Sequence, residues 1–213
     1  MKKIFLLMTT TLLFAACADE DFDINRDPDS LSAGGVALST EMPAGIAGVA
    51  GGEGAIFALV GGFWSQYWTQ SFASNQYKDI DNYSVSTVDY PQVWQAMYDA
   101  LADIRNVKRN AEAQGNWNYY LMATVMKAYT FQVLVDFYDK VPYSEAFQGA
   151  TNIQPHFDDG YAIYQGLLDE LDTALNKDFD LSSNLVAGTT DLVFTAPDAS
   201  WNIQPWIRFA NTL

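Results

Sequence analysis

Hydrophobic residues recur at the three-and-four spacing of one helix face along much of this 213-residue chain. The first such stripe starts at Ile56 and predicts a helix over residues 56–72. A second follows Pro91, which is tolerated in the first turn of a helix, and predicts a helix over residues 91–114 that Gly115 ends. A third stripe predicts a helix over residues 158–177, with Asp158 placed to cap it. Residues 206–213 begin a further helix.

Residues 119–138 differ from these stretches because they are apolar on almost every side of a helix. Such a pattern is typical of a helix that is buried on several sides. Lys127 and Asp136 argue against a membrane span, since each charge would cost about 2.5 to 3.5 kcal/mol at mid-membrane. The segment is therefore predicted to be the central core helix.

The remaining stretches lack helical periodicity. Residues 34–62 are rich in Gly and Ala and offer few core residues, which predicts an irregular segment with a loosely helical end. Residues 74–90 are predicted to be a long polar and aromatic loop, and residues 182–200 a second loop. Paired helices joined by loops predict an all-α, tetratricopeptide-like helical solenoid with long irregular loops, although no 34-residue period is visible.

The amino terminus has the layout of a secretory signal peptide over residues 1–16, with Lys2 and Lys3 ahead of an apolar run. Cys17 is the only cysteine, so no internal disulfide can form. The residues before Cys17 resemble the lipobox of bacterial lipoproteins, which implies lipid attachment at Cys17. Residues 17–33 are then a lipidated flexible tether, and its acidic residues 19–21 resemble a surface-export signal.

The charge balance bears on the class of partner. The chain carries 26 acidic and 11 basic Lys and Arg residues, for a formal net charge of -15. Nucleic acid is excluded as a partner, because a phosphate backbone requires a basic stripe. Aromatic residues make up 15% of the chain, enough to build a core and leave rings for a ligand.

Three segments together carry a resemblance to a known family. They are residues 22–28 (FDINRDP), 136–146 (DFYDKVPYSEA) and 206–213 (WIRFANTL). In this order they are similar to motifs of the SusD/RagB family of nutrient-binding outer-membrane lipoproteins, in particular its second SusD-like branch. Within the second motif, residues 139–142 are expected to turn the chain out of the core helix, where Pro142 fixes one backbone dihedral. Glu145 is expected to hydrogen-bond backbone near that turn.

The resemblance also implies a function. It implies a SusD-like fold, no enzymatic activity, a glycan or oligopeptide ligand, and a lipid-anchored protein exposed on the outer membrane. The implied partner is a SusC-like TonB-dependent transporter that receives the ligand. Family members are usually longer, so residues 34–213 are expected to be the amino-terminal part of a truncated helical domain.

A surface-attached, glycan-degrading hydrolase is the alternative function, and it would need two carboxylates held about 5 to 10 Å apart in a cleft. The candidate pairs are Asp158 with Asp159 and Glu170 with Asp172, although helix capping and a solvated helix face explain them better. The single histidine, His156, has no serine or cysteine motif beside it. We therefore assign no catalytic residue, no metal and no cofactor.

Ligand binding is better supported, because sugar and peptide faces stack on exposed aromatic rings. The candidate ligand-binding residues lie in or beside the irregular polar segment, and they are Tyr77, Tyr83, Tyr90 and Trp94. Loops held by a rigid scaffold are where binding residues concentrate.

Overall fold

The computed structural model describes residues 36–86 and 88–213, and the compact unit spans Ala37–Leu213. The predicted signal peptide, Cys17 and the tether lie outside the described residues. The longer helices are α2 (Leu38–Gly52), α3 (Ala58–Trp64), α5 (Pro91–Gln114), α6 (Trp117–Tyr138), α7 (Gly160–Leu175) and α8 (Gln204–Ala210). Short elements complete the set: the π-helical turn η2 (Glu53–Phe57), α4 (Lys78–Asp81), η3 (Gly149–Thr151) and η4 (Gly188–Thr190).

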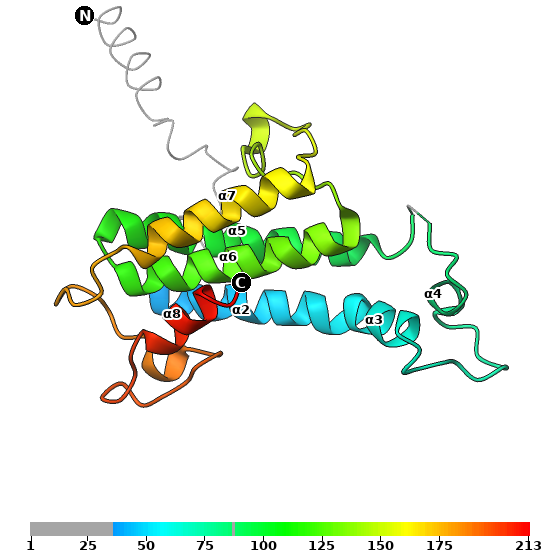
Figure 1. Cartoon of the computed structure of the whole chain (residues 1–213), viewed down its shortest axis with the longest axis horizontal. Helices are drawn as coiled ribbons and strands as arrows, with labels where there is room; N and C mark the ends of the chain where they lie inside the picture. Colours follow the sequence, from blue (N-terminus) through cyan, green and yellow to red (C-terminus); the bar gives the residue numbers. More distant parts are fainter. Residues whose placement is uncertain (1–35, 87) are drawn as a thin grey trace, which may run out of the picture. The chain divides into compact units, whose positions relative to one another are not determined.

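α6 is the central helix, as the sequence predicts. Its buried residues lie on every side of the helix and include Tyr119, Leu121, Val125, Phe131 and Leu134. At its start, the Asn116 side chain accepts a hydrogen bond from the backbone N–H of Tyr119. α2, α5, α7 and α8 all pack against α6, and Figure 1 shows α5 and α7 running beside it. The predicted all-α architecture is confirmed.

The predicted stripes of α5 and α7 face this core, with one correction at the start of α7. Gly115 ends α5 in the left-handed conformation, with a φ of 64°. α7 is capped by Asp159, whose side chain accepts from the backbone N–H of Tyr161, so the prediction that Asp158 caps this helix was wrong. On α7, Ile163 is buried, whereas Leu168 is exposed.

α2 contradicts the prediction that residues 34–62 are irregular. Its glycines face α5 at very short range: a Cβ on Gly48 would lie 2.9 Å from the Ala100 Cβ, and a Cβ on Gly45 would lie 2.9 Å from Ile104. On the same helix, Met42, Ile46 and Val49 are buried. The small residues that weaken the helix pattern are the ones that let two helix backbones approach closely.

The predicted helix over residues 56–72 is also shorter in the structure, because α3 ends at Trp64. The Ser65 hydroxyl donates to the Gly61 carbonyl, and Gln66 adopts a left-handed φ of 63°. The chain then folds back, so that the backbone N–H of Trp68 donates to the Gly62 carbonyl. This reversal exposes the Trp64 and Trp68 rings, which are 46% and 52% exposed.

The segment before α8 is organised by one buried carboxylate. Asp191 accepts hydrogen bonds from the indole N–H groups of Trp201 and Trp206, at 2.9 and 2.7 Å. Its other oxygen accepts from the backbone N–H groups of Val193 and Phe194. Four donors satisfy this carboxylate and fix the long loop against α6 and α8, because a buried charge is stable only when it is fully hydrogen-bonded.

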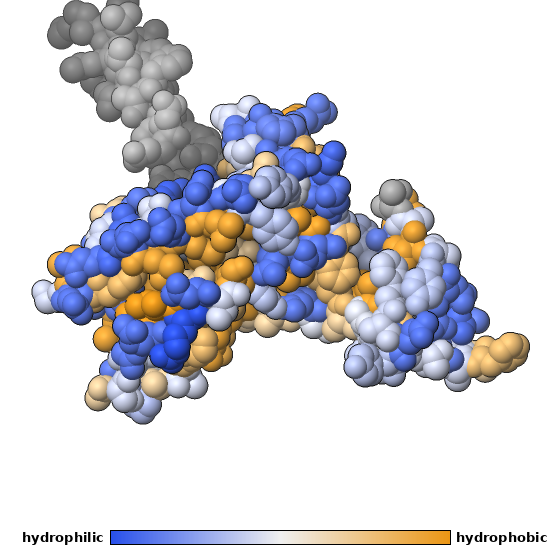
Figure 2. Space-filling model, in the orientation of Figure 1, coloured by the Kyte–Doolittle hydropathy of each residue, from blue (hydrophilic) through white to orange (hydrophobic). Residues whose placement is uncertain are grey.

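Among the described residues, one helical stretch, Leu38–Trp64, is long and apolar enough to cross a bilayer by length and composition. The core helix of a soluble protein passes the same test, and one face of α2 packs on α5. Figure 2 shows a further band of apolar surface along α6 and around α8, below the polar surface of α7.

The contact between α2 and α5 generates a matched prediction. Gly48→Ala should lower the free energy of unfolding by about 1 kcal/mol, because overpacking against Ala100 outweighs the gain in helix propensity. Gly51→Ala, on the same helix, meets nothing within 4 Å and should raise that free energy by up to about 1 kcal/mol. Urea unfolding followed by circular dichroism measures both. Equal stabilisation by the two substitutions would contradict the close packing of these helices.

Candidate ligand-binding site

A cavity of about 370 Å³ opens where α3, the carboxyl end of α6 and residues 85–90 meet, and we call it the aromatic cavity. Its floor is apolar, with few polar groups at its edge. Its lining residues are Ile56, Phe57, Val60, Gly61, Trp64, Val85, Ser86, Asp89, Tyr90, Val93, Asp136, Phe137 and Tyr138.

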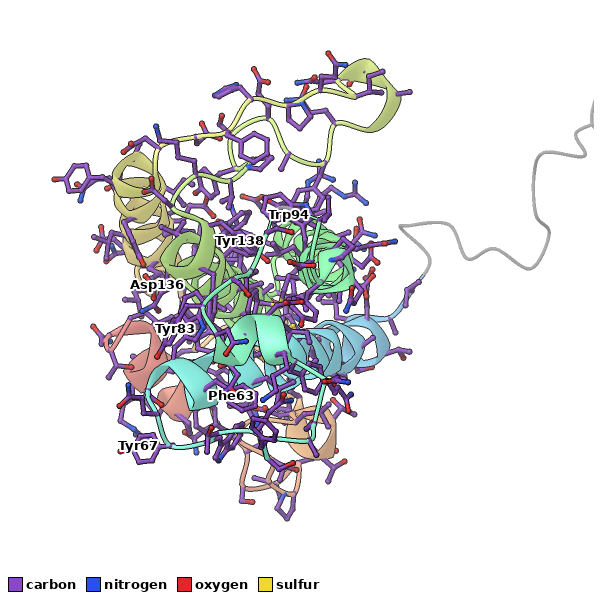
Figure 3. The ribbon with its side chains drawn as sticks, turned by 90° about the vertical axis from the view of Figure 1, so that its right-hand side faces the viewer. Phe63, Tyr67, Tyr83, Trp94, Asp136 and Tyr138 are labelled. Atoms are coloured by element: carbon purple, nitrogen blue, oxygen red, sulfur yellow. The ribbon has the colours of Figure 1, made fainter. Side chains whose placement is uncertain are left out.

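One wall of the aromatic cavity is a cluster of stacked rings. Phe57 stacks on Phe137, with 4.1 Å between the ring centroids and 27° between the ring planes, and meets Tyr138 edge-on. Trp94 packs edge-on against Tyr138 from α5, and Figure 3 shows these two side chains close together at the end of the bundle. Phe137 and Tyr138 are 41% and 40% exposed, so their rings are available to a ligand.

Another wall of the cavity includes Trp64, and Tyr83 packs against Trp64 without itself lining the cavity. Their rings stack with centroids 5.7 Å apart, and the Trp64 indole N–H donates to the Ile80 carbonyl at 3.0 Å. The Tyr83 hydroxyl donates to the Trp64 carbonyl at 3.4 Å. These bonds fix the two rings to α4 and the loop around it, so the wall is held in place before a ligand arrives.

Two carboxylates border the cavity. Asp89 accepts from the backbone N–H and the hydroxyl of Ser86, and the backbone bond lowers the pKa of Asp89. Asp136 accepts from the Tyr164 hydroxyl at 2.6 Å. Burial, together with this bond, raises the pKa of Tyr164 to about 12. The cavity therefore offers hydrogen-bond acceptors beside exposed rings.

The structure disperses the four residues singled out from the sequence. Tyr90 lines the cavity, and Tyr83 stacks on Trp64 and is 57% exposed. Tyr77 is half-buried and packs against Tyr90 and the small core around Phe63, behind the cavity. Trp94 is half-buried among the rings of Tyr98, Tyr138 and Phe157.

Three of these residues share a strained backbone. Tyr77, Tyr83 and Tyr90 have positive φ angles of 58°, 58° and 53°. A bulky residue rarely adopts this left-handed conformation, and such strain persists only where surrounding contacts over-determine it. The strained positions thus concentrate in the loop that forms one side of the cavity.

Sequence reasoning missed several lining residues. Phe57 lies in the predicted helix over residues 56–72, and Phe137 and Tyr138 lie at the end of the predicted core helix and in a family motif, but none of the three was predicted to bind a ligand. A signal for the latter pair does exist in the sequence, since they sit at the end of a helix that is apolar on all sides and just before a turn. Rings at the end of a core helix are exposed, because the neighbouring helices no longer pack against them.

Comparison with known proteins identifies the family. Residues 58–213 match the model of the second SusD-like family, which is described as starch-binding and associating with the outer membrane. The chain belongs to this SusD-like family. The match covers most of the chain and confirms the resemblance carried by its motifs.

A solved structure shares the fold. It is a SusD/RagB family protein from Bacteroides thetaiotaomicron, with a TM-score of 0.68 and 21% sequence identity. The alignment covers 82% of the present chain and 36% of that protein, so the chain spans about a third of its length. No curated protein matches the sequence. The family is described by binding and not by a reaction, in agreement with the prediction that this chain is not an enzyme.

The candidate catalytic pairs have structural roles in this SusD-like chain. Asp158 accepts from the backbone N–H groups of Tyr143 and Ser144 and from the Ser144 hydroxyl. Asp159 caps α7, and Glu170 binds two lysines. Within the described part of the chain, no group of three His, Cys, Asp or Glu side chains could hold a metal ion.

The family motif forms a loop that His156 closes. Asp139 leaves α6 with a φ of 62°, and a single antiparallel bridge joins Val141 to Asp158. His156 bridges two carboxylates, with its Nδ1 3.0 Å from Glu145 and its Nε2 3.0 Å from Asp158. Glu145 also accepts from the backbone N–H of His156, which confirms its expected bond to the backbone.

These bonds shift three pKa values. Hydrogen bonding and charge from Glu145 raise the pKa of His156 above 6.5. The backbone N–H of His156 and the Asn152 side chain lower the pKa of Glu145 below 4.5. Partial burial opposes ionisation of Asp158, but bonds from Ser144 and Tyr143 hold its pKa below 3.8.

The loop closed by His156 is therefore predicted to be most stable in a window of mildly acidic pH. The contribution of His156 is complete below pH 6.5 and is lost as the pH rises through its raised pKa. The contributions of Glu145 and Asp158 are complete above pH 4.5 and are lost as the pH falls through their lowered pKa values. Hydrogen exchange at the amides of Tyr143 and Ser144, corrected for intrinsic rates, measures this profile.

The matched control is His156→Gln. Its exchange profile should lack the change on the alkaline side and keep the change on the acidic side. If the variant instead kept the parent's increase in exchange on the alkaline side, the histidine would not hold the loop.

Proposed function

We propose that this protein is a cell-surface binding lipoprotein that captures a glycan in the aromatic cavity and delivers it to a SusC-like TonB-dependent transporter in the outer membrane. The observation that carries the proposal is the cavity lined by exposed, fixed aromatic rings. Its volume of about 370 Å³ falls within the range of small-molecule sites.

The chemistry of the cavity favours a sugar over an oligopeptide as its ligand. Sugar rings present flat C–H faces that stack on aromatic rings, and their hydroxyls donate to carboxylates. Phe137, Tyr138 and Trp64 supply the rings, and Asp89 and Asp136 supply the acceptors. The description of the family as starch-binding supports the same ligand class. An extended peptide would instead need open backbone donors and acceptors in a row.

The place of the protein in the cell completes the proposal. Acylation of Cys17 would attach the chain to the outer membrane, since each buried methylene contributes about 0.8 kcal/mol and several acyl chains anchor a protein stably. The acidic tether after Cys17 would expose the binding domain at the cell surface. A transporter partner follows from the family resemblance, and the family's association with the outer membrane supports it.

Ligand capture is tested by Phe137→Ala. The ring stacks on Phe57 at the cavity wall and carries no polar group, so its loss should weaken binding of a maltooligosaccharide about two- to tenfold while the fold persists. Isothermal titration measures the affinity. The control is Tyr67→Ala, because Tyr67 is 87% exposed and lies outside the cavity, at the periphery in Figure 3. Equal affinities of Phe137→Ala and the parent would place the ligand elsewhere.

The anchor and the partner are tested together with Cys17→Ser. The parent protein should carry a radioactive fatty acid, remain in the membrane fraction, and co-purify with a TonB-dependent barrel from detergent-solubilised outer membranes. Cys17→Ser should lose the label and leave the membrane fraction. Label on the variant would disprove lipidation at Cys17, and recovery of the parent protein alone would disprove the partnership.

A further inference from the structure

A second cavity, of about 310 Å³, lies between α5, α6 and residues 143–148. It shares no lining residue with the aromatic cavity. Its character is different as well, because cations line it. Arg105 and Lys108 come from α5, and Lys127 comes from α6. We call it the cationic cavity.

The grouping of these cations stands out against the charge of the whole chain. Only 11 residues are Lys or Arg, against 26 Asp and Glu, and three of the 11 line this one cavity. A net charge of -15 repels anions at long range. An anionic ligand would therefore be held here by local contacts and not by the general field of the protein.

One carboxylate neutralises part of the cluster. Glu170 on α7 lies 2.5 Å from the Lys108 Nζ and 2.6 Å from the Lys127 Nζ. Burial alone would raise the pKa of Glu170, but the two lysines lower it to about 2. Three of the lining side chains are cations and none is a carboxylate, and Glu170 pairs with only two of the three cations.

Arg105 supplies the cation that is open to a ligand. Within the described residues, its guanidinium forms no ion pair with a carboxylate, and it lies 5.9 Å from the centroid of the Phe147 ring. Its neighbours one helical turn away on α5 are Leu101, Ala102, Lys108 and Arg109, none of which is acidic. A guanidinium presents a planar pair of N–H donors that matches the two oxygens of a carboxylate.

The rest of the lining suits a sugar ring more than a bare inorganic anion. Ser144 and Gln148 contribute neutral hydrogen-bonding groups, and Tyr143 and Phe147 contribute aromatic rings. The Tyr143 hydroxyl is fixed by a bond to Glu170 at 2.7 Å, and the Lys127 Nζ lies 4.7 Å from the centroid of the Tyr143 ring. A small anion would use the cations alone and would make no use of the Gln148 amide or the Phe147 ring.

We propose that the cationic cavity binds a hexuronate unit of an acidic glycan, with Arg105 paired to the sugar carboxylate and the neutral lining groups on its ring. The positions of Lys108 and Lys127 are set by Glu170, so the cavity is organised before binding. This site extends the proposed function from neutral glycans to acidic ones, and it does not depend on the aromatic cavity.

The proposal is tested by isothermal titration of the protein with trigalacturonate, and with a neutral galactose trisaccharide as the matched ligand. Arg105→Gln should weaken binding of trigalacturonate by about tenfold, because a hydrogen bond between two charged groups is lost. Arg109→Gln is the control variant. Arg109 lies one helical turn after Arg105 on α5, bonds to Asn106 and does not line the cavity, so this substitution should leave the affinity unchanged.

Each contrary result is informative. The proposal is overturned if trigalacturonate does not bind, if it binds no more tightly than the neutral trisaccharide, or if Arg105→Gln and Arg109→Gln weaken binding equally. Displacement of the sugar by an equal concentration of sulfate would also overturn it, by showing a site for any small anion. A maltooligosaccharide titrated into Phe137→Ala reports on the aromatic cavity alone, so the two proposals can fail separately.

Discussion

The need to cover α6 on every side governs the arrangement of the other helices. A helix that is apolar all round loses its stabilisation wherever a face meets water, at about 25 cal/mol for each Å² exposed. α5, α7, α8 and α2 therefore pack against it from different directions. α2 can join this arrangement because its glycines let it lie almost in backbone contact with α5.

Polar groups within this apolar arrangement are held by specific partners, and these partners connect elements far apart in the chain. Lys127 is the charge that α6 carries into the core region, and burial lowers its pKa while Glu170 on α7 offsets part of that effect. Asp191 holds the loop before α8 in place by accepting hydrogen bonds from two tryptophan indoles. Breaking such a pair by removing one member leaves an uncompensated charge, so these contacts fix the relative positions of the helices.

The aromatic cavity lies at the carboxyl end of α6, where the other helices no longer bury it. Phe137 and Tyr138 continue the apolar character of the helix beyond the last packed turn, and η2 and α3 meet them with Phe57 and Trp64. Tyr90, one of the strained tyrosines of the neighbouring loop, also lines the cavity. In this SusD-like chain the candidate binding surface is thus the exposed continuation of its core, which explains why rings are both fixed and accessible there.

The sequence by itself determined the stripes of α5 and α7, the burial of α6, the turn after Tyr138 and the family, because periodicity and short motifs are local properties. Only the tertiary structure decided that residues 38–52 form a helix, since Gly48 leaves room for α2 to pack closely on Ala100 of α5, a contact that no local pattern encodes. The same holds for the aromatic cavity, where Phe57 and Phe137 meet across the fold. Tyr77 and Tyr90 look alike in sequence, yet one lies behind the cavity and the other lines it, because side-chain direction follows from the backbone and its packing.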